Sequence, residues 1–250
     1  IAIIGMAGRF PGADSVEQFW HNLRAGVESL TVLPREASEP SPAAVPDAVA
    51  ARGLLANVDQ FDAALFRLTP RQAQMLDPQQ RLWLECVHRA LEDAGLPVSE
   101  AGYTGANANI GVFAGGNAST YLWHLLGGSR DAVDALLQRT GDEAHQLAIS
   151  NDTDSLATRT SFVMGFTGPS INVQTASSTS LVAVAQACHA LSSRQCDLVI
   201  AGGVAVRFPQ TGDSARQAGG IHSQDGHCRA FDARATGTVF SDGVGAVVLK

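Results

Sequence analysis

A short β-type segment at residues 170–174 leads through small hydroxyl residues into a strongly apolar helix. The helix is expected to begin at about Thr179 and to end near Leu191. It is rich in alanine and apolar nearly all round, which is typical of a helix buried on all sides. A strand, a sharp turn and a buried helix together present one side chain at a helix N-terminus, where backbone N–H groups favour negative charge. This arrangement places the hydroxyl cluster that contains Ser177 at the start of the helix.

Strand-like and helix-like segments alternate along the rest of the chain. Short apolar runs are typical of strands covered on both faces, whereas apolar residues at helical spacing predict amphipathic helices. Strands are predicted at residues 1–5, 110–115, 170–174, 198–203 and 246–249, and helices at 16–25, 78–94, 120–126, 130–137, 154–164 and 179–191. This alternation predicts a mainly parallel sheet, in which the first strand is parallel and covered on both faces.

Capping residues and prolines mark the boundaries of these elements. Ser15 is predicted to cap a helix that Gly26 ends, and Pro78 suits the first turn of the helix that follows Asp77. Residues 34–47 contain four prolines and are predicted to form an exposed loop. Several apolar residues of the two longest middle helices are expected to face the core: Leu82, Trp83, Cys86, Val87, Ala90, Leu91, Leu156, Ala157, Phe162 and Val163.

The composition excludes several classes of function. A net charge of −7 leaves no basic surface for nucleic acid. No apolar run reaches the roughly 18 residues that a membrane span needs, and no basic segment precedes residues 1–5, so neither a span nor a signal peptide is expected. The four cysteines form no CxxC pair, which is typical of reduced thiols. We therefore expect a cytoplasmic protein.

Several sequence words, in order along the chain, resemble those of the ketosynthases of modular polyketide synthases. Ser177, with Thr175 and Ala176 before it and Ser178 after it, lies in a segment similar to the family's Thr-Ala-Cys-Ser nucleophile motif. The other words are residues 3–12, residues 61–62 with 77–82, residues 157–159 with 168–170, residues 196–204 and residues 225–232. On these residues the chain is identified as a member of the beta-ketoacyl synthase family, with residues 1–250 as the N-terminal domain.

The resemblance implies a thiolase-like fold. In that fold two related α/β halves form a layered α-β-α-β-α architecture, usually in a homodimer, and this chain is expected to be the N-terminal half. The family's two catalytic histidines belong to an HGTGT word and a GH word of the second half. The HGTGT word does not occur in this sequence, and none of its seven histidines is assigned either role.

The resemblance also implies an acyltransferase that catalyses decarboxylative Claisen condensation. An acyl group moves from an acyl carrier protein to the enzyme nucleophile, and a malonyl-type extender on a carrier protein then loses CO2 and attacks it. The implied partners are acyl carrier protein, a second copy of the chain, and acyltransferase and other synthase domains, with neither nucleic acid nor membrane. No metal or organic cofactor is expected, because the phosphopantetheine arm belongs to the carrier protein.

Serine at position 177 alters the implied chemistry, because the family has its nucleophilic cysteine there. A helix N-terminus stabilises an anion by roughly 0.3–1 kcal/mol, which helps to ionise a thiol of reference pKa about 8.5 but is far too little for a serine hydroxyl. A serine needs a paired general base, and no residue next to Ser177 in the sequence is one. We expect acyl attachment at Ser177, with turnover impaired.

The sequence leaves five other interpretations of Ser177. The serine is either an engineered replacement of cysteine or a natural variant with weak activity. A non-catalytic ketosynthase-like scaffold or chain-length partner subunit is a different class of function. A serine hydrolase is disfavoured, because no Gly-x-Ser-x-Gly word surrounds Ser177. Taken alone, the hydroxyl cluster is typical of a helix N-cap.

Two further clusters have a simpler explanation than catalysis. His222, His227 and Cys228 have a spacing unsuited to a zinc pair and favour a polar loop. Asp152 and Asp154 diverge on a helix, which favours capping over acid–base work. We therefore predict no metal site and no carboxylate pair.

Overall fold

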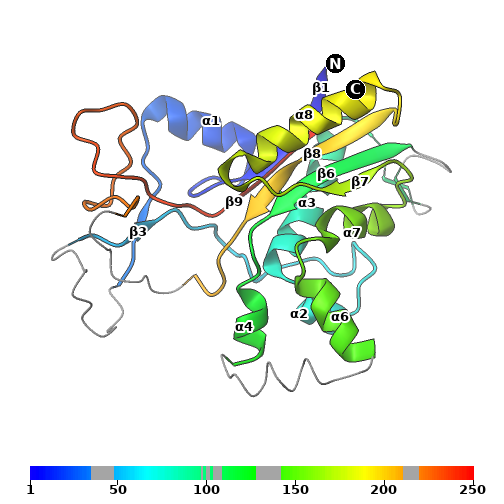
Figure 1. Cartoon of the computed structure of the whole chain (residues 1–250), viewed down its shortest axis with the longest axis horizontal. Coiled ribbons are helices and arrows are strands. Elements are labelled where there is room, and N and C mark those ends of the chain that lie inside the picture. The colour runs from blue at the N-terminus through cyan, green and yellow to red at the C-terminus, as the bar shows by residue number, and fades with distance from the viewer. Residues whose placement is uncertain (35–47, 97, 100–101, 104–108, 128–141, 211–219) are drawn as a thin grey trace.

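The computed structural model describes residues 1–34, 48–96, 98–99, 102–103, 109–127, 142–210 and 220–250. At its centre lies a five-stranded sheet with the order β1-β9-β8-β6-β7 (Figure 1). Helix α8 (Thr179–Ser192) packs on one face of this sheet, while α3 (Pro78–Asp93) and α7 (Ser155–Met164) pack on the other. The five strands are β1 (Ile3–Arg9), β6 (Ile110–Gly116), β7 (Ser170–Asn172), β8 (Leu198–Ala205) and β9 (Gly243–Leu249).

The remaining elements of the described residues are short and flank this layer. The strand pairs β2–β3 and β4–β5 are antiparallel. The longest described helix, α3, has 16 residues, and no described helix is long and apolar enough to cross a lipid bilayer. These elements are α1 (Val16–Ala25), β2 (Thr31–Val32), β3 (Ala51–Arg52), α2 (Pro70–Met75), β4 (Val98–Ser99), β5 (Gly102–Tyr103), α4 (Tyr121–Leu125), α6 (Asp142–Asn151) and the 3-10 turn η1 (Ala176–Ser178).

The sheet is mixed, so the prediction of a mainly parallel sheet is wrong. Strand β6 pairs in parallel with β7 and β8, but β9 runs antiparallel between β8 and β1. The first strand is therefore an antiparallel edge strand, and its Ile3 side chain is 56% exposed. An apolar run does not reveal the direction of its neighbour. The chain that joins β8 to β9 returns at the same end of the sheet, because β9 begins beside the end of β8, where Gly243 pairs with Ala205. Strand β9 therefore runs antiparallel to β8.

Apolar side chains fill the space on both faces of the sheet. On the α3 side Trp83 is fully buried, and its indole Nε1 donates to Thr160 Oγ1 at 2.9 Å. On the other side the alanines of α8 lie against the sheet, so the helix backbone approaches it closely. The predicted core face of α3 is confirmed, since all six of its residues are buried: Leu82, Trp83, Cys86, Val87, Ala90 and Leu91.

Two predictions of burial are wrong. Helix α8 is buried along the face that carries Ala183 and Ala187, while Leu181 is 75% exposed. In α7, Leu156 is buried as predicted, but Phe162 is 87% exposed. Apolarity on every side of a helix does not select the side that packs, so the sequence alone leaves these faces undetermined. The predicted helix at 130–137 and most of the predicted loop at 34–47 lie outside the described residues.

The predicted helix boundaries are confirmed by the cap geometry. The Ser15 side chain accepts from the Gln18 backbone N–H, and Gly26 ends α1 in the left-handed conformation with φ 67°. The Asp77 side chain accepts from the Gln79 backbone N–H at 2.7 Å, with Pro78 in the first turn of α3. Short-range chemistry therefore determines where these two helices begin.

Gly115 allows the chain after β7 to lie close against β6. A Cβ at Gly115 would meet the Val173 carbonyl oxygen at 2.1 Å and Thr179 Cγ2 at 2.2 Å. We expect Gly115→Ala to lower the free energy of unfolding by about 1–3 kcal/mol, because the backbone must shift to make room. The control is Gly116→Ala, where the nearest atom lies 3.5 Å from the new Cβ. Urea unfolding measures both variants, and equal stabilities would contradict the expectation.

Candidate active site

Ser177 lies in the turn between β7 and α8, as the sequence predicts. The backbone N–H of Val173 donates to the Ala114 carbonyl at 2.8 Å, which keeps the chain against β6 beyond the end of β7. Ala176 then adopts φ 54°, in the left-handed region that residues other than glycine rarely occupy. Backbone strain of this kind persists where the surrounding structure holds it, and it often accompanies functional sites. Here it turns the chain sharply, directly before Ser177.

The hydroxyl groups on either side of Ser177 are bound within the turn. Ser178 Oγ donates to the Thr175 carbonyl at 2.8 Å, and Thr179 Oγ1 accepts from the Thr175 backbone N–H at 3.0 Å. Ser177 is exposed, and its hydroxyl makes no hydrogen bond with any described residue. The helix-cap interpretation of Ser177 is therefore wrong, and its hydroxyl is free to meet a ligand.

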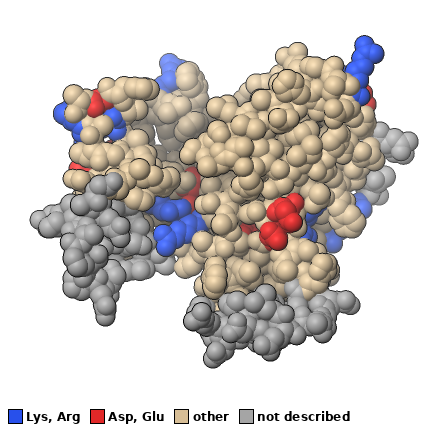
Figure 2. Space-filling view, viewed as in Figure 1, with Lys and Arg blue, Asp and Glu red and all other residues tan. Residues whose placement is uncertain are grey.

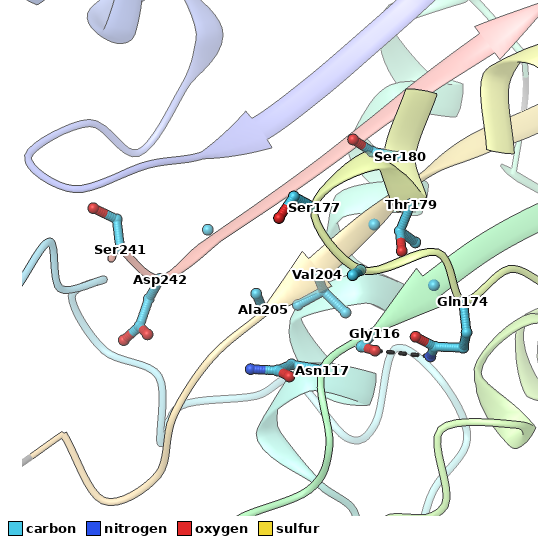
Figure 3. Close-up of a pocket in the computed structure, with 14 residues that line it drawn as sticks. Gly116, Asn117, Gln174, Ser177, Thr179, Ser180, Val204, Ala205, Ser241 and Asp242 are labelled. Atoms are coloured by element: carbon cyan, nitrogen blue, oxygen red, sulfur yellow. Dashed lines mark hydrogen bonds between the residues drawn. The ribbon is translucent and has the colours of Figure 1, made fainter. Parts of the chain in front are cut away.

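An open pocket of about 380 Å³ lies in front of Ser177. Its walls come from the C-terminal ends of the parallel strands β6 and β8, the start of α8 and the residues before β9, and such strand ends are where α/β proteins bind ligands. The Ser177 hydroxyl points into the space bordered by Ser241, Ala205 and Asn117 (Figure 3). The lining residues are Gly115, Gly116, Asn117, Gln174, Ala176, Ser177, Thr179, Ser180, Gly203, Val204, Ala205, Ser241, Asp242 and Gly243.

Asp242 is the one ionisable residue among these lining residues, and its carboxylate is already engaged. The Arg52 Nη2 atom lies 2.7 Å from Asp242 Oδ1, and Gln210 Nε2 donates to Asp242 Oδ2 at 2.7 Å. The Asp242 side chain is fully buried, whereas that of Arg52 is 19% exposed. Among the described residues that line the pocket, none is therefore a free general base for Ser177, and a serine hydrolase would need one.

Charged groups are sparse around the outer face of α8. On the face shown in Figure 2, uncharged side chains cover this region, and the Lys and Arg side chains of the described residues form no continuous basic surface.

Burial raises the pKa of the Cys86 thiol to about 12, so this thiol stays protonated and unreactive near neutral pH. The cysteines are free thiols in the structure.

The other polar clusters of the sequence are not brought into this pocket. His227 Nδ1 lies 2.7 Å from Glu28 Oε2, and the ring of His222 packs against Phe240 with centroids 5.1 Å apart. Within the described ranges no three His, Cys, Asp or Glu side chains are grouped so as to hold a metal ion. Asp154 occupies the N-cap position of α7, as predicted, but its side chain makes no cap hydrogen bond.

Comparison with known proteins identifies the fold and the family together. The family model described as "Beta-ketoacyl synthase, N-terminal domain" matches residues 1–250. The chain belongs to the beta-ketoacyl synthase family. It is 46% identical, over 255 residues, to a subunit of the phenolphthiocerol/phthiocerol polyketide synthase of Mycobacterium tuberculosis, and the match covers 100% of this chain and 17% of that relative. It is 38% identical to a hybrid PKS-NRPS synthetase of Cordyceps militaris, covering 100% of this chain and 15% of the relative.

Solved ketosynthases have the same fold. Ketosynthase twelve of the bacillaene polyketide synthase of Bacillus amyloliquefaciens matches with a TM-score of 0.81 at 29% identity, over 100% of this chain and 40% of that one. A cysteine-to-serine mutant of the module 6 ketosynthase of the bacillaene synthase of Bacillus subtilis 168 matches with a TM-score of 0.76 at 30% identity, over 100% of this chain and 39% of that one. The predicted thiolase-like α/β fold is confirmed. This ketosynthase chain spans about two fifths of the solved chains that it matches and a smaller part of the curated relatives.

Proposed function

We propose that this chain carries the acyl-accepting site of a polyketide synthase ketosynthase, with Ser177 as the residue that takes the acyl group. The observation that carries the proposal is the position of the Ser177 hydroxyl, which lacks a described partner and faces the pocket at the start of α8. The polyketide synthase relatives support the reaction class.

In the first step Ser177 Oγ attacks the carbonyl carbon of an acyl thioester on a carrier protein. The C–O bond forms, the C–S bond breaks, and the hydroxyl proton passes to the departing phosphopantetheine thiolate. Backbone N–H groups at the start of α8 stabilise the negative oxygen of the tetrahedral intermediate. A malonyl-type extender on a carrier protein then loses CO2, and its carbanion attacks the acyl carbonyl. The C–C bond forms, the C–O bond to Ser177 breaks, and the departing Ser177 alkoxide takes a proton from water.

This chemistry is slow with serine at position 177, because a helix N-terminus does not ionise a hydroxyl and none of the described lining residues is a free base that takes its proton. The same observation favours a second candidate function, a non-catalytic ketosynthase-like scaffold or chain-length partner subunit. The two differ in one measurable property, since only the enzyme takes an acyl group onto Ser177.

The proposed partners are acyl carrier protein, a second copy of the chain, and acyltransferase and other synthase domains, in the cytoplasm and with neither nucleic acid nor membrane. The reaction uses no cofactor of its own. The homodimer is supported by the exposed side chains of Phe162 on α7 and Ile171 on the adjoining strand β7, because neighbouring exposed apolar residues are typical of protein interfaces. The carrier protein is supported by the class of the relatives, which are polyketide synthase components.

The test is transfer of an acyl group from hexanoyl-loaded acyl carrier protein to the intact protein, followed by mass spectrometry. We expect slow addition of one hexanoyl group to the parent protein and none to the Ser177→Ala variant. Hexanoyl transfer that persists in Ser177→Ala would contradict the assignment of Ser177. Failure to acylate both the parent and the Ser177→Cys protein would support the scaffold instead.

A further inference from the structure

Gln79, in the first turn of α3, uses every hydrogen-bonding position of its side-chain amide. Its Oε1 atom accepts from the backbone N–H of Asn117 at 3.1 Å and of Val206 at 3.2 Å. Its Nε2 atom donates to the Asn117 carbonyl at 3.0 Å and to Asp77 Oδ2 at 3.3 Å. A carboxamide has two acceptor lone pairs and two donor hydrogens, so this amide is saturated. The residue is only 3% exposed, and no water is needed to complete the set.

The partners of Gln79 lie where two strands of the sheet separate. The parallel ladder between β6 and β8 ends at the pair Gly116–Val204. Beyond it, the Asn117 backbone N–H also donates to the Val204 carbonyl at 3.2 Å, whereas the Val206 backbone N–H is bound by Gln79 Oε1. The amide of Gln79 therefore joins the two strand ends one residue further along. Asn117 and Ala205 line the pocket of Ser177 (Figure 3). Gln79 bonds Asn117 and Val206, the residue after Ala205, so it supports the strand ends that form this wall.

We propose that Gln79 is a positioning residue, which holds the ends of β6 and β8 at a fixed spacing and so sets the shape of the pocket wall beside position 177. The inference rests on the proposed acyl transfer. Gln79 does not line the pocket, so it acts through Asn117 and Ala205 on the fit of the acyl group. A leucine at position 79 has neither donors nor acceptors. A shorter asparagine keeps the amide but does not reach Asn117 and Val206 together.

The neighbouring Gln80 provides a matched control. It is 4% exposed, and its side-chain amide is also bound within the fold. Its Nε2 atom donates to the carbonyls of Ser150 at 3.1 Å and Asp152 at 3.2 Å, and its Oε1 atom accepts from Arg159 Nε at 2.6 Å. None of these partners lines the pocket. Gln80→Leu therefore removes a buried amide from the same helical turn without touching the pocket wall.

The experiment compares Gln79→Leu, Gln79→Asn and Gln80→Leu in the full protein that carries Ser177→Cys. Hydrogen exchange at the backbone N–H of Val206, for which Gln79 Oε1 is the acceptor, reports the link between the two strand ends. Acylation of position 177 by the hexanoyl thioester of N-acetylcysteamine reports its effect. For both Gln79 variants we expect exchange at least tenfold faster than in Gln80→Leu. We also expect a half-saturating thioester concentration at least fivefold higher, with a limiting rate within twofold.

A general loss of stability would speed hydrogen exchange across the whole fold in all three variants. It would not raise the half-saturating thioester concentration while leaving the limiting acylation rate unchanged. If both Gln79 variants have the same half-saturating thioester concentration as Gln80→Leu, the proposal is overturned. If the Ser177→Cys protein with Gln79 intact is not acylated, the proposed function fails on its own. The link between the strand ends is then tested by exchange at the Val206 backbone N–H, and equal exchange there in Gln79→Asn and Gln80→Leu overturns the proposal.

Discussion

Replacing Ser177 by cysteine is expected to raise the rate of acylation at position 177 by about 10²-fold or more, which is the range that a missing general base accounts for. A thiol at the start of α8 has a reference pKa of about 8.5 and ionises without a paired base, whereas the serine hydroxyl does not. Among the described residues that line the pocket, Asp242 is the one ionisable group, and it is engaged with Arg52. The measurement is the rate at which hexanoyl-loaded acyl carrier protein acylates the parent and the Ser177→Cys proteins.

Ser178→Cys is the matched control for this expected gain. Ser178 lies one residue further along the same turn, but it does not line the pocket, and its Oγ atom donates to the Thr175 carbonyl. We therefore expect Ser178→Cys to acylate at the rate of the parent protein. An equal gain in both cysteine variants would show that any thiol in the turn reacts, and would remove the special position of Ser177.

Asp242→Ala is expected to lower the free energy of unfolding by about 3–5 kcal/mol, the range seen when one partner of a buried ion pair is removed. Asp242 is fully buried and holds Arg52 Nη2 and Gln210 Nε2 at 2.7 Å each. The backbone N–H of Arg207 also donates to Asp242 Oδ1 at 3.2 Å. This one carboxylate therefore joins β3, the end of β8 and the start of β9 beside the pocket.

Asp232→Ala is the control, because it breaks an ion pair on the surface. Asp232 Oδ2 lies 3.0 Å from Arg234 Nη2, and the Arg234 side chain is 80% exposed. Water screens and replaces such a pair, so its loss changes stability little. Urea unfolding of both variants gives the comparison. If Asp242→Ala destabilised the protein no more than Asp232→Ala, the structural role assigned to Asp242 would be wrong.

Local signals in the sequence predicted most of the elements, but not how they meet. Ser15, Gly26 and Pro78 marked helix ends correctly, because a cap acts within a few residues of its partners. The antiparallel pairing of β9 was not predicted, since strand direction depends on long connections that an apolar run does not encode. The exposure of Leu181 was missed for a related reason, because α8 is apolar on every side.

The candidate site was predictable only where its residues lie together in the chain. The turn around Ser177 stood out because strand, hydroxyl cluster and helix are consecutive. Gln79 lies in residues 77–82, which resemble a family motif, but this segment predicted only the start of a helix. Its partners Asn117 and Val206 lie 38 and 127 residues away. Asp242 and Arg52 are 190 residues apart, so no local pattern pairs them.

The most direct test of acyl attachment at position 177 is to locate the acyl group on the Ser177→Cys protein. After incubation with hexanoyl-loaded acyl carrier protein, trypsin digestion yields residues 160–194 as one peptide, and fragmentation distinguishes position 177 from Cys188. We expect hexanoyl at position 177, with Cys86, Cys188, Cys196 and Cys228 unmodified. Absence of hexanoyl at position 177, or equal labelling of the exposed Cys228, would contradict it.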